Sequence, residues 1–426
     1  MADLRQTILD WISQDEEELV QFYRDFVRAR SPNPPGDTRE AMGLVGDRLS
    51  AWGIKHDVVH APGKDHLPNI VADFEAAQPG RHLVLNGHVD VFPIGNPDSW
   101  ERDPWSGEVI DGRVFGRGAT DMKPGTTASI FCYRYLERLR DQLKGRLTLT
   151  VVSDEETSGR WGTGYLFETM PERVRGDCLL NGEPTGVETI RFGEKGIIRF
   201  KVRVRTRGAH SPYPHLSPSA IDKACETILA LKTMAGSEGE GIPAEILDHL
   251  NKQEVRALVD KIMGVGTADV IKQFTVNIGT ITGGTTANMI ADYCEFHVDI
   301  REPVGTPSGE TLRRATDIVQ RTPGAEVFDV TGGSETNWST TQHELIDIIS
   351  DTVVSLGRPA PVLLPMLAGS DCRFWRKAGV PAYVYGPGSR NIAAPNESGS
   401  IEDFLHVVRV HTLAAATYLG AGGAGA

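Results

Sequence analysis

The chain has few cysteines for its 426 residues, and none of them lie close together in the sequence. No two form a CxxC pair; the five are Cys132, Cys178, Cys225, Cys294 and Cys372. An odd number of widely spaced cysteines argues against a disulfide framework and against a zinc site built from thiolates. They are typical of a protein in a reducing compartment.

Long apolar runs and an excess of basic residues are also missing. No stretch approaches the roughly 20 apolar residues of a membrane span, and acidic residues occupy the N-terminal region where a signal peptide has its apolar core. The 44 Lys and Arg residues face 57 Asp and Glu, for a formal charge of −13 at pH 7. Proteins that bind nucleic acid or anionic lipid normally carry a basic surplus. We therefore expect a cytoplasmic protein that acts on a small molecule and binds neither nucleic acid nor membrane.

Three short apolar runs in the first half of the chain each end in a polar cluster. The runs cover residues 83–85, 147–152 and 178–180, and the clusters after them cover 86–90, 153–156 and 181–185. Helix-length stretches separate the runs, which is typical of buried strands in a mostly parallel sheet flanked by helices. In such α/β sheets the ligand crevice lies at the carboxyl ends of the strands, where all three clusters are placed.

The pattern changes after about Thr185. Residues 189–207 alternate between apolar and charged side chains, as in a sheet with one wet face. Further strands are predicted at 275–282, 293–301 and 325–330, with helices at 217–234 and 310–321, which gives a compact α+β unit. The segment 236–269 has no interpretable pattern. We predict a discontinuous first domain, residues 1–187 plus 337–426, interrupted by a smaller inserted α+β domain, residues 188–336.

The polar clusters are rich in carboxylates. They contain His88 and Asp90 in an H-x-D triplet, the adjacent pair Glu155 and Glu156, and Glu183, while Asp121 lies in a glycine-rich segment. Each has an ordinary alternative, such as a helix cap for Asp121 or a solvated loop for the glutamate pair. Together they would repel one another in one crevice unless cations were bound. A nitrogen and oxygen ligand set without thiolate suits two zinc ions, with Co or Mn nearly as suitable.

The motifs that carry these residues resemble a known family. GHVDV, GRGATDMKPG, SDEETSG and GEPTG are followed by GAHSP, GGTTANMIADYCEFHVDIR and GSDCRFWRKAGVPA, in that order. The sequence resembles the dinuclear metallopeptidases and deacylases that include acetylornithine deacetylase, succinyl-diaminopimelate desuccinylase, aminoacylase-1 and the glutamate carboxypeptidases. The resemblance implies a catalytic α/β domain, an inserted lid and dimerisation domain, and a homodimer formed through that insertion.

The resemblance also implies roles for the carboxylates and for His88. His88 and Glu183 would bind one metal, Asp121 would bridge to the second metal, and Glu156 would bind that second metal. Asp90 would brace the His88 ring, and Glu155 would be the general base. A cis peptide is expected after Asp121.

Three residues of the inserted domain match family positions that act on the substrate. His210 would stabilise the oxyanion, often from a partner subunit, and its alternative is an ordinary loop histidine. Asn288 and Arg301 would grip the substrate, and arginine suits bidentate capture of a carboxylate. The alternative for Arg301 is a surface charge at the end of a strand.

One expected metal ligand is missing. The family has a histidine in a segment like H-x-P-N-E, whereas this chain has Ala393 there, or Ala394 if the alignment shifts by one residue. Neither side chain binds a metal. His406, the next histidine downstream, lies in a predicted helix and is interpreted as structural. Either the chain was deliberately substituted at this ligand, or it is a natural chain with one strong metal site and altered activity.

Three functions remain in competition on the sequence alone. The leading one is a metal-dependent hydrolase that cleaves a C–N bond in a small carboxylate-bearing substrate, such as an N-acyl amino acid or a dipeptide. The second is a hydrolytic deaminase or amidase for an aromatic or xenobiotic amine. The third is a ligand-binding protein with weakened or lost activity, which only Ala393 supports.

Overall fold

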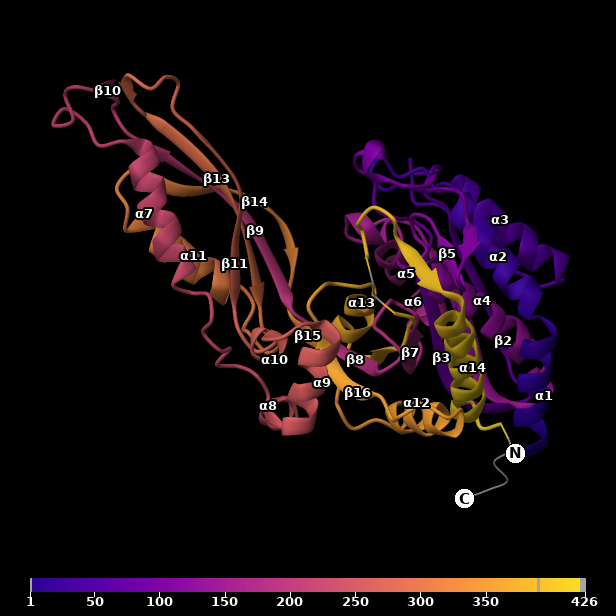
Figure 1. Cartoon of the computed structure of the whole chain (residues 1–426). Coiled ribbons are helices and arrows are strands. Elements are labelled where there is room, and N and C mark those ends of the chain that lie inside the picture. Colours follow the sequence, from indigo (N-terminus) through magenta and orange to yellow (C-terminus); the bar gives the residue numbers. More distant parts are fainter. Residues whose placement is uncertain (1, 389–390, 422–426) are drawn as a thin grey trace. The chain divides into compact units, whose positions relative to one another are not determined.

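The computed structural model describes residues 2–388 and 391–421. The chain divides into two compact units (Figure 1). Unit 1 comprises Met1–Phe192, Ser339–Leu364 and Ser370–Ala426, and unit 2 comprises Gly193–Trp338 and Pro365–Gly369. A second unit is thus inserted into the sequence of the first.

The largest sheet has a parallel centre with antiparallel margins, and most of its strands belong to unit 1. Its strands are β1 (Asp57–Val59), β2 (Asn69–Glu75), β3 (Gln78–His88), β6 (Lys144–Val152), β7 (Cys178–Asn181), β8 (Thr189–Glu194), β15 (Asn337–Trp338), β16 (Val362–Met366) and β17 (Ala382–Val384). The order is β1-β2-β6-β3-β7-β17-β8-β15, with β16 beside β8. Strands β6, β3, β7 and β17 run parallel, while β1, β2, β8 and β15 join antiparallel. This confirms the predicted α/β class and adds the antiparallel margins.

The centre of this sheet is apolar on both faces because helices cover both. Leu83, Val84 and Leu85 of β3 are fully buried, as are Leu147 and Leu149 of β6. Helices α4 (Lys123–Glu137) and α14 (Ile401–Tyr418) pack on β3, with α1 (Ala2–Gln14), α2 (Glu16–Arg28) and α12 (Glu344–Ser355) beyond them. Helix α13 (Cys372–Lys377) packs on β7 and β17, and α6 (Pro171–Val174) packs on β6. Burial on both faces explains why these strands are continuous apolar runs.

Unit 1 also contains two further α-helices and a small three-stranded sheet. Helix α3 (Arg39–Ala51) contacts β2, and helix α5 (Thr163–Thr169) contacts α13. A small sheet joins β4 (Glu108–Ile110), β5 (Arg113–Phe115) and β18 (Ser398–Ser400). Because β18 pairs with β5, the segment that follows Ala393 is tied to the loop that leads to Asp121.

Unit 2 is a four-stranded antiparallel sheet with helices on one face. Its order is β11 (Thr275–Gly283), β13 (Tyr293–Glu302), β9 (Gly196–Arg205) and β14 (Ala325–Ser334). Helices α7 (Ala220–Lys232) and α11 (Glu310–Gln320) pack on it, and the short strands β10 (Ala209–His210) and β12 (Met289–Ile290) pair with each other. The predicted α+β order is confirmed. The segment without a predicted pattern forms α8 (Ala244–Asn251), α9 (Gln253–Met263) and α10 (Thr267–Val270).

Within residues 2–388 and 391–421, every helix is too short or too polar to traverse a lipid bilayer.

Candidate metal centre

The candidate ligands lie where neighbouring parallel strands end. His88 is the last residue of β3, Glu155 and Glu156 begin the turn η3 (Glu155–Thr157) after β6, and Glu183 follows β7. Strand β3 lies between β6 and β7, so their carboxyl ends share one edge of the sheet. Asp121 reaches the same edge from the loop before α4, and its peptide bond to Met122 is cis, as the resemblance implied.

The ligand atoms are close enough to share cations. His88 Nε2 lies 3.3 Å from Asp121 Oδ1 and 3.4 Å from Glu183 Oε1. One set, from His88, Asp121 and Glu156, has all its ligand atoms within 4.8 Å of one another, and so does a second set from His88, Glu155 and Glu183. Both sets include His88, so the carboxyl ends of these strands bring together enough nitrogen and oxygen ligands to hold a metal ion.

Three buried atoms of this cluster have no hydrogen-bond partner among the described residues. They are His88 Nε2, Asp121 Oδ1 and Glu156 Oε1. An unpaired buried polar atom costs about 1–3 kcal/mol, so three of them in one place require an explanation. A metal ion would accept a lone pair from each, and the residues present therefore fit a bound metal.

The electrostatics of the cluster also favour added positive charge. Burial, followed by the charge of Asp121, raises the pKa of both Glu156 and Glu183 well above its usual range. Burial alone would lower the pKa of His88, but Glu183 and Asp121 outweigh it and raise that pKa. Each shift reduces the net negative charge of the site, which is also the effect of a bound cation.

Asp90 connects the histidine to the glutamate turn. His88 Nδ1 lies 2.8 Å from the backbone oxygen of Asp90 and 3.5 Å from its carboxylate. The same carboxylate accepts hydrogen bonds from the backbone N–H of Glu155 at 3.2 Å and of Glu156 at 3.1 Å, and from Asn33 Nδ2 at 2.9 Å. Burial raises the pKa of Asp90, but the hydrogen bond with His88 and the other donors lower it overall. Asp90 is thus placed to orient both the ring and the turn.

Glycine allows two ligand loops to meet backbone to backbone. Gly125 lies in the first turn of α4, just after Asp121, and Gly182 directly precedes Glu183. A Cβ atom at Gly125 would collide with the carbonyl oxygen of Gly182. Glycine here sets the spacing between the Asp121 loop and Glu183.

The loop that contains Ala393 is fixed against the backbone of Asp121. Glu397 Oε1 accepts hydrogen bonds from the N–H groups of Thr120 at 2.8 Å and Asp121 at 3.2 Å. Arg117 binds the other oxygen of Glu397 at 2.5 Å and the backbone oxygen of Ala393 at 3.1 Å. Ala393 is exposed and has a φ of 60°. Ala393 thus lies beside the Asp121 loop, and its methyl group cannot bind a metal.

The other predicted site residues belong to unit 2 and occupy opposite ends of its sheet. His210 pairs with Met289, and the N–H of Ser211 donates to the backbone oxygen of Asn288 at 3.0 Å. These residues lie beyond the Tyr293 end of β13. Arg301 lies near the other end of β13, where its Nε donates to Asp299 at 2.7 Å. The structure brings His210 and Asn288 together and places Arg301 apart from them.

Two residues that contact the site were not predicted from the sequence. One contacts Glu155, the candidate base, and the other contacts Asp90. Arg373 donates to Glu155 Oε1 at 2.8 Å, and Asn33 donates to Asp90. The motif GSDCRFWRKAG contains Arg373 but predicts no role for it. Asn33 lies among prolines, where a polar side chain is an ordinary turn residue.

His406, predicted to be structural, is buried beside a second buried histidine of α14. His406 Nε2 lies 2.9 Å from Tyr385 Oη, and His411 Nε2 lies 2.6 Å from the Tyr385 backbone oxygen. Burial lowers the pKa of each histidine to about 4. Between pH 6.5 and 4 the unfolded chain takes up protons that the folded chain does not, so stability falls as the pH falls.

We therefore expect the free energy of unfolding, measured in urea, to fall as the pH is lowered from 7 to 5. The fully buried His411 contributes at most about 2 kcal/mol to this decrease. In His411→Gln this acid-dependent loss becomes smaller, whereas in His60→Gln, at an exposed position, it is unchanged. Equal pH dependence of all three chains would contradict the assignment.

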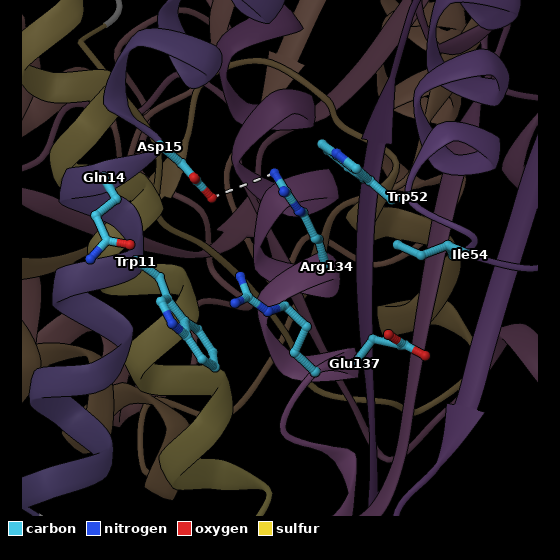
Figure 2. Close-up of a pocket in the computed structure, with 8 residues that line it drawn as sticks. Trp11, Gln14, Asp15, Trp52, Ile54, Arg134 and Glu137 are labelled. Carbon is cyan, nitrogen blue, oxygen red and sulfur yellow. Dashed lines mark ion pairs between the residues drawn. The ribbon is translucent and has the colours of Figure 1, made fainter.

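A separate pocket of unit 1 lies among its outer helices. Figure 2 shows it between α1, the C-terminal part of α4 and the segment after α3, with Trp11, Asp15, Trp52 and Arg134 around it. Arg134 pairs with Asp15 at 3.5 Å and with Glu18 at 2.9 Å. None of the candidate ligands lines this pocket, so it is separate from the metal centre.

Comparison with known proteins identifies the family. The model of Peptidase family M20/M25/M40 matches residues 84–417. Succinyl-diaminopimelate desuccinylase of Methylorubrum extorquens is 34% identical over 200 residues, which is 45% of this chain and 51% of that protein. The aligned stretch thus covers about half the length of that relative.

Solved structures share the fold. An M20 family metallo-carboxypeptidase from Sulfolobus solfataricus superposes with a TM-score of 0.77 at 17% identity, over 94% of this chain and 99% of that one. A Bacillus subtilis protein described as a dinuclear metal binding peptidase from the M20 family superposes with a TM-score of 0.65 at 15% identity, over 96% and 99% of the two chains. Since the family model matches most of the sequence and the fold agrees over nearly all of it, this chain belongs to Peptidase family M20/M25/M40.

Proposed function

We propose that the chain is a metal-dependent hydrolase that cleaves the amide bond of a small carboxylate-bearing substrate, such as an N-acyl amino acid or a dipeptide. The observation that carries this proposal is the cluster of unpaired buried ligand atoms next to Glu155. Membership of a peptidase family and the likeness to a desuccinylase support it, because both names describe cleavage of a C–N bond.

Two divalent ions fit the site, with zinc the first candidate and Co or Mn the alternatives. His88 and Glu183 would hold one ion, Asp121 would bridge both, and Glu156 would hold the second. Bound there, the ions would lower the pKa of a water molecule and polarise the substrate carbonyl. Without a histidine at position 393, the second ion would have fewer protein ligands than the first.

Glu155 would move the proton. In the proposed step its carboxylate takes a proton from the attacking water and then gives it to the departing nitrogen, so the glutamate ends as it began. Burial raises the pKa of Glu155, although Arg373 opposes the shift. A higher pKa brings a carboxylate closer to the range in which it both accepts and returns a proton.

The residues of unit 2 support a homodimer. Tyr293 and Arg301 lie eight residues apart on β13, which corresponds to about 26 Å in a strand. His210 and Asn288 lie beyond the Tyr293 end, so one small substrate cannot contact both Arg301 and His210 of the same chain. We propose that Arg301 captures the substrate carboxylate and that a second copy, joined through unit 2, supplies His210 for the oxyanion.

Mixing two inactive variants tests this arrangement. Glu155→Gln and His210→Ala are purified separately, unfolded together in equal amounts and refolded. If His210 acts across the dimer, half of the dimers are mixed and each has one intact site, so about a quarter of the normal activity returns. If His210 acts within its own chain, neither subunit of the mixed dimer is intact and no activity returns.

A substrate panel tests the proposed function. The zinc-loaded chain is incubated with N-acyl amino acids, dipeptides and aryl amides, and the products are identified by mass spectrometry. We expect cleavage of the first two classes and its loss on chelation. Cleavage of aryl amides alone would favour an amidase for aromatic amines. Tight binding without cleavage would favour a binding protein.

A further inference from the structure

The segment Ser370-Asp371-Cys372-Arg373 has no role in the mechanism described so far. It enters α13 in unit 1, and Asp371 is fully buried while Arg373 is 9% exposed. Buried charged side chains are rare unless they have a partner or a task. The partner of Arg373 is the candidate general base.

Arg373 holds one oxygen of Glu155. Its Nη1 lies 2.8 Å from Glu155 Oε1 and 2.7 Å from the backbone oxygen of Ser370. The bond to Ser370 ties the guanidinium to its own turn, so the group is fixed before it meets the carboxylate. Oε2 of Glu155 accepts no hydrogen bond from the part of the chain that the structure describes, residues 2–388 and 391–421.

Asp371 forms a longer ion pair with Arg373 on the other side of the guanidinium. Its Oδ1 lies 3.8 Å from Arg373 Nη2, and its Oδ2 accepts a hydrogen bond from Thr163 Oγ1 at 2.7 Å. The turn that carries Glu155 closes over this pair. A Cβ atom at Gly159 would lie 2.7 Å from Asp371 Oδ1 and 3.0 Å from Arg373 Nη2, and Gly159 has a φ of 67°.

We propose that Arg373 is a positioning residue for Glu155, with Asp371 as its buried ion-pair neighbour. The guanidinium holds Oε1, which leaves Oε2 as the atom that takes the proton of the water and returns it to the leaving nitrogen. This inference rests on the proposed hydrolase function. A glutamate has three side-chain torsions, and a base held in one arrangement spends more time in reactive geometry than a mobile one.

Kinetics of Arg373 variants test the proposal, in the parent chain and in the Ala393→His background. We expect Arg373→Ala to lower kcat by about 100-fold with little change in KM, because the lost interaction acts in the transition state. Zinc content stays unchanged, since no ligand is removed. Millimolar guanidinium restores part of the kcat of Arg373→Ala, and Arg373→Lys retains part of it.

The control is Arg160→Ala, on the same loop as Glu155 but exposed and stacked on Trp161. It should leave kcat unchanged and show no response to guanidinium. A purely structural role for Arg373 would instead lower the melting temperature and the zinc content, without rescue. Unchanged kcat in Arg373→Ala would overturn the proposal.

A readout independent of activity separates this inference from the proposed function. In crystals of zinc-loaded Arg373→Ala, we expect Glu155 in more than one rotamer while His88, Glu156 and Glu183 stay in place. A single unchanged Glu155 rotamer would overturn the positioning role. If the parent chain and Ala393→His both cleave no amide, the hydrolase function fails, and the rotamers still decide whether Arg373 holds Glu155.

Discussion

Glu155→Gln is expected to lower kcat by about 10²- to 10⁴-fold while the chain keeps its metal. Glutamine has nearly the same shape as glutamate but cannot take a proton from water. The side chain of Glu155 is mostly buried beside Arg373 and is not needed to hold the metal in the proposed ligand set. Turnover is measured on the best substrate of the panel, and zinc is measured on the same sample.

Two matched variants make this result specific. Glu156→Gln alters the neighbouring carboxylate and should lower zinc content as well as turnover, because Glu156 is a proposed ligand. Glu168→Gln alters an exposed glutamate of α5 and should change neither quantity. If Glu155→Gln kept full turnover, or lost its zinc as Glu156→Gln does, Glu155 would not be the base.

Ala393→His is expected to raise zinc from about one ion toward two ions per chain and to raise turnover by about tenfold or more. The loop of Ala393 is fixed to the Asp121 backbone through Glu397, so an imidazole there would be held beside the Asp121 loop. Histidine also occurs at positive φ more often than most residues, so the φ of 60° can be kept.

The neighbouring position provides the control. Ala394→His places the same imidazole one residue further on, in the same fixed loop, and tests the alternative alignment. If Ala394→His gains the second zinc and Ala393→His does not, the missing ligand lies at position 394. If neither variant changes zinc content or turnover, the missing ligand has been placed in the wrong loop.

The sequence predicted the parallel centre of the sheet and the gathering of polar residues at its edge. Apolar runs such as 147–152 are buried on both faces, and residues that follow such runs meet at the carboxyl ends of the strands. The antiparallel margins were not predictable, since an apolar run has the same pattern in either direction.

The side chains that contact Glu155 and Asp90 come from distant parts of the chain. Arg373 meets Glu155 across 218 positions, and Asn33 meets Asp90 across 57. No periodicity relates residues so far apart, and each looks ordinary in its own segment. The candidate ligands could be found in the sequence because every one follows a recognisable strand or glycine-rich loop. The residues that orient them could not.

We propose that His88 and the carboxylates beyond the ends of β3, β6 and β7 form a metal site. The most direct test is a crystal structure of the zinc-treated chain with data collected on both sides of the zinc absorption edge. We predict an anomalous peak bonded to His88 Nε2, Asp121 and Glu183, with a weaker peak toward Glu156 that strengthens in Ala393→His. A zinc-saturated crystal with no peak at His88, or with zinc bound only elsewhere, would contradict the claim.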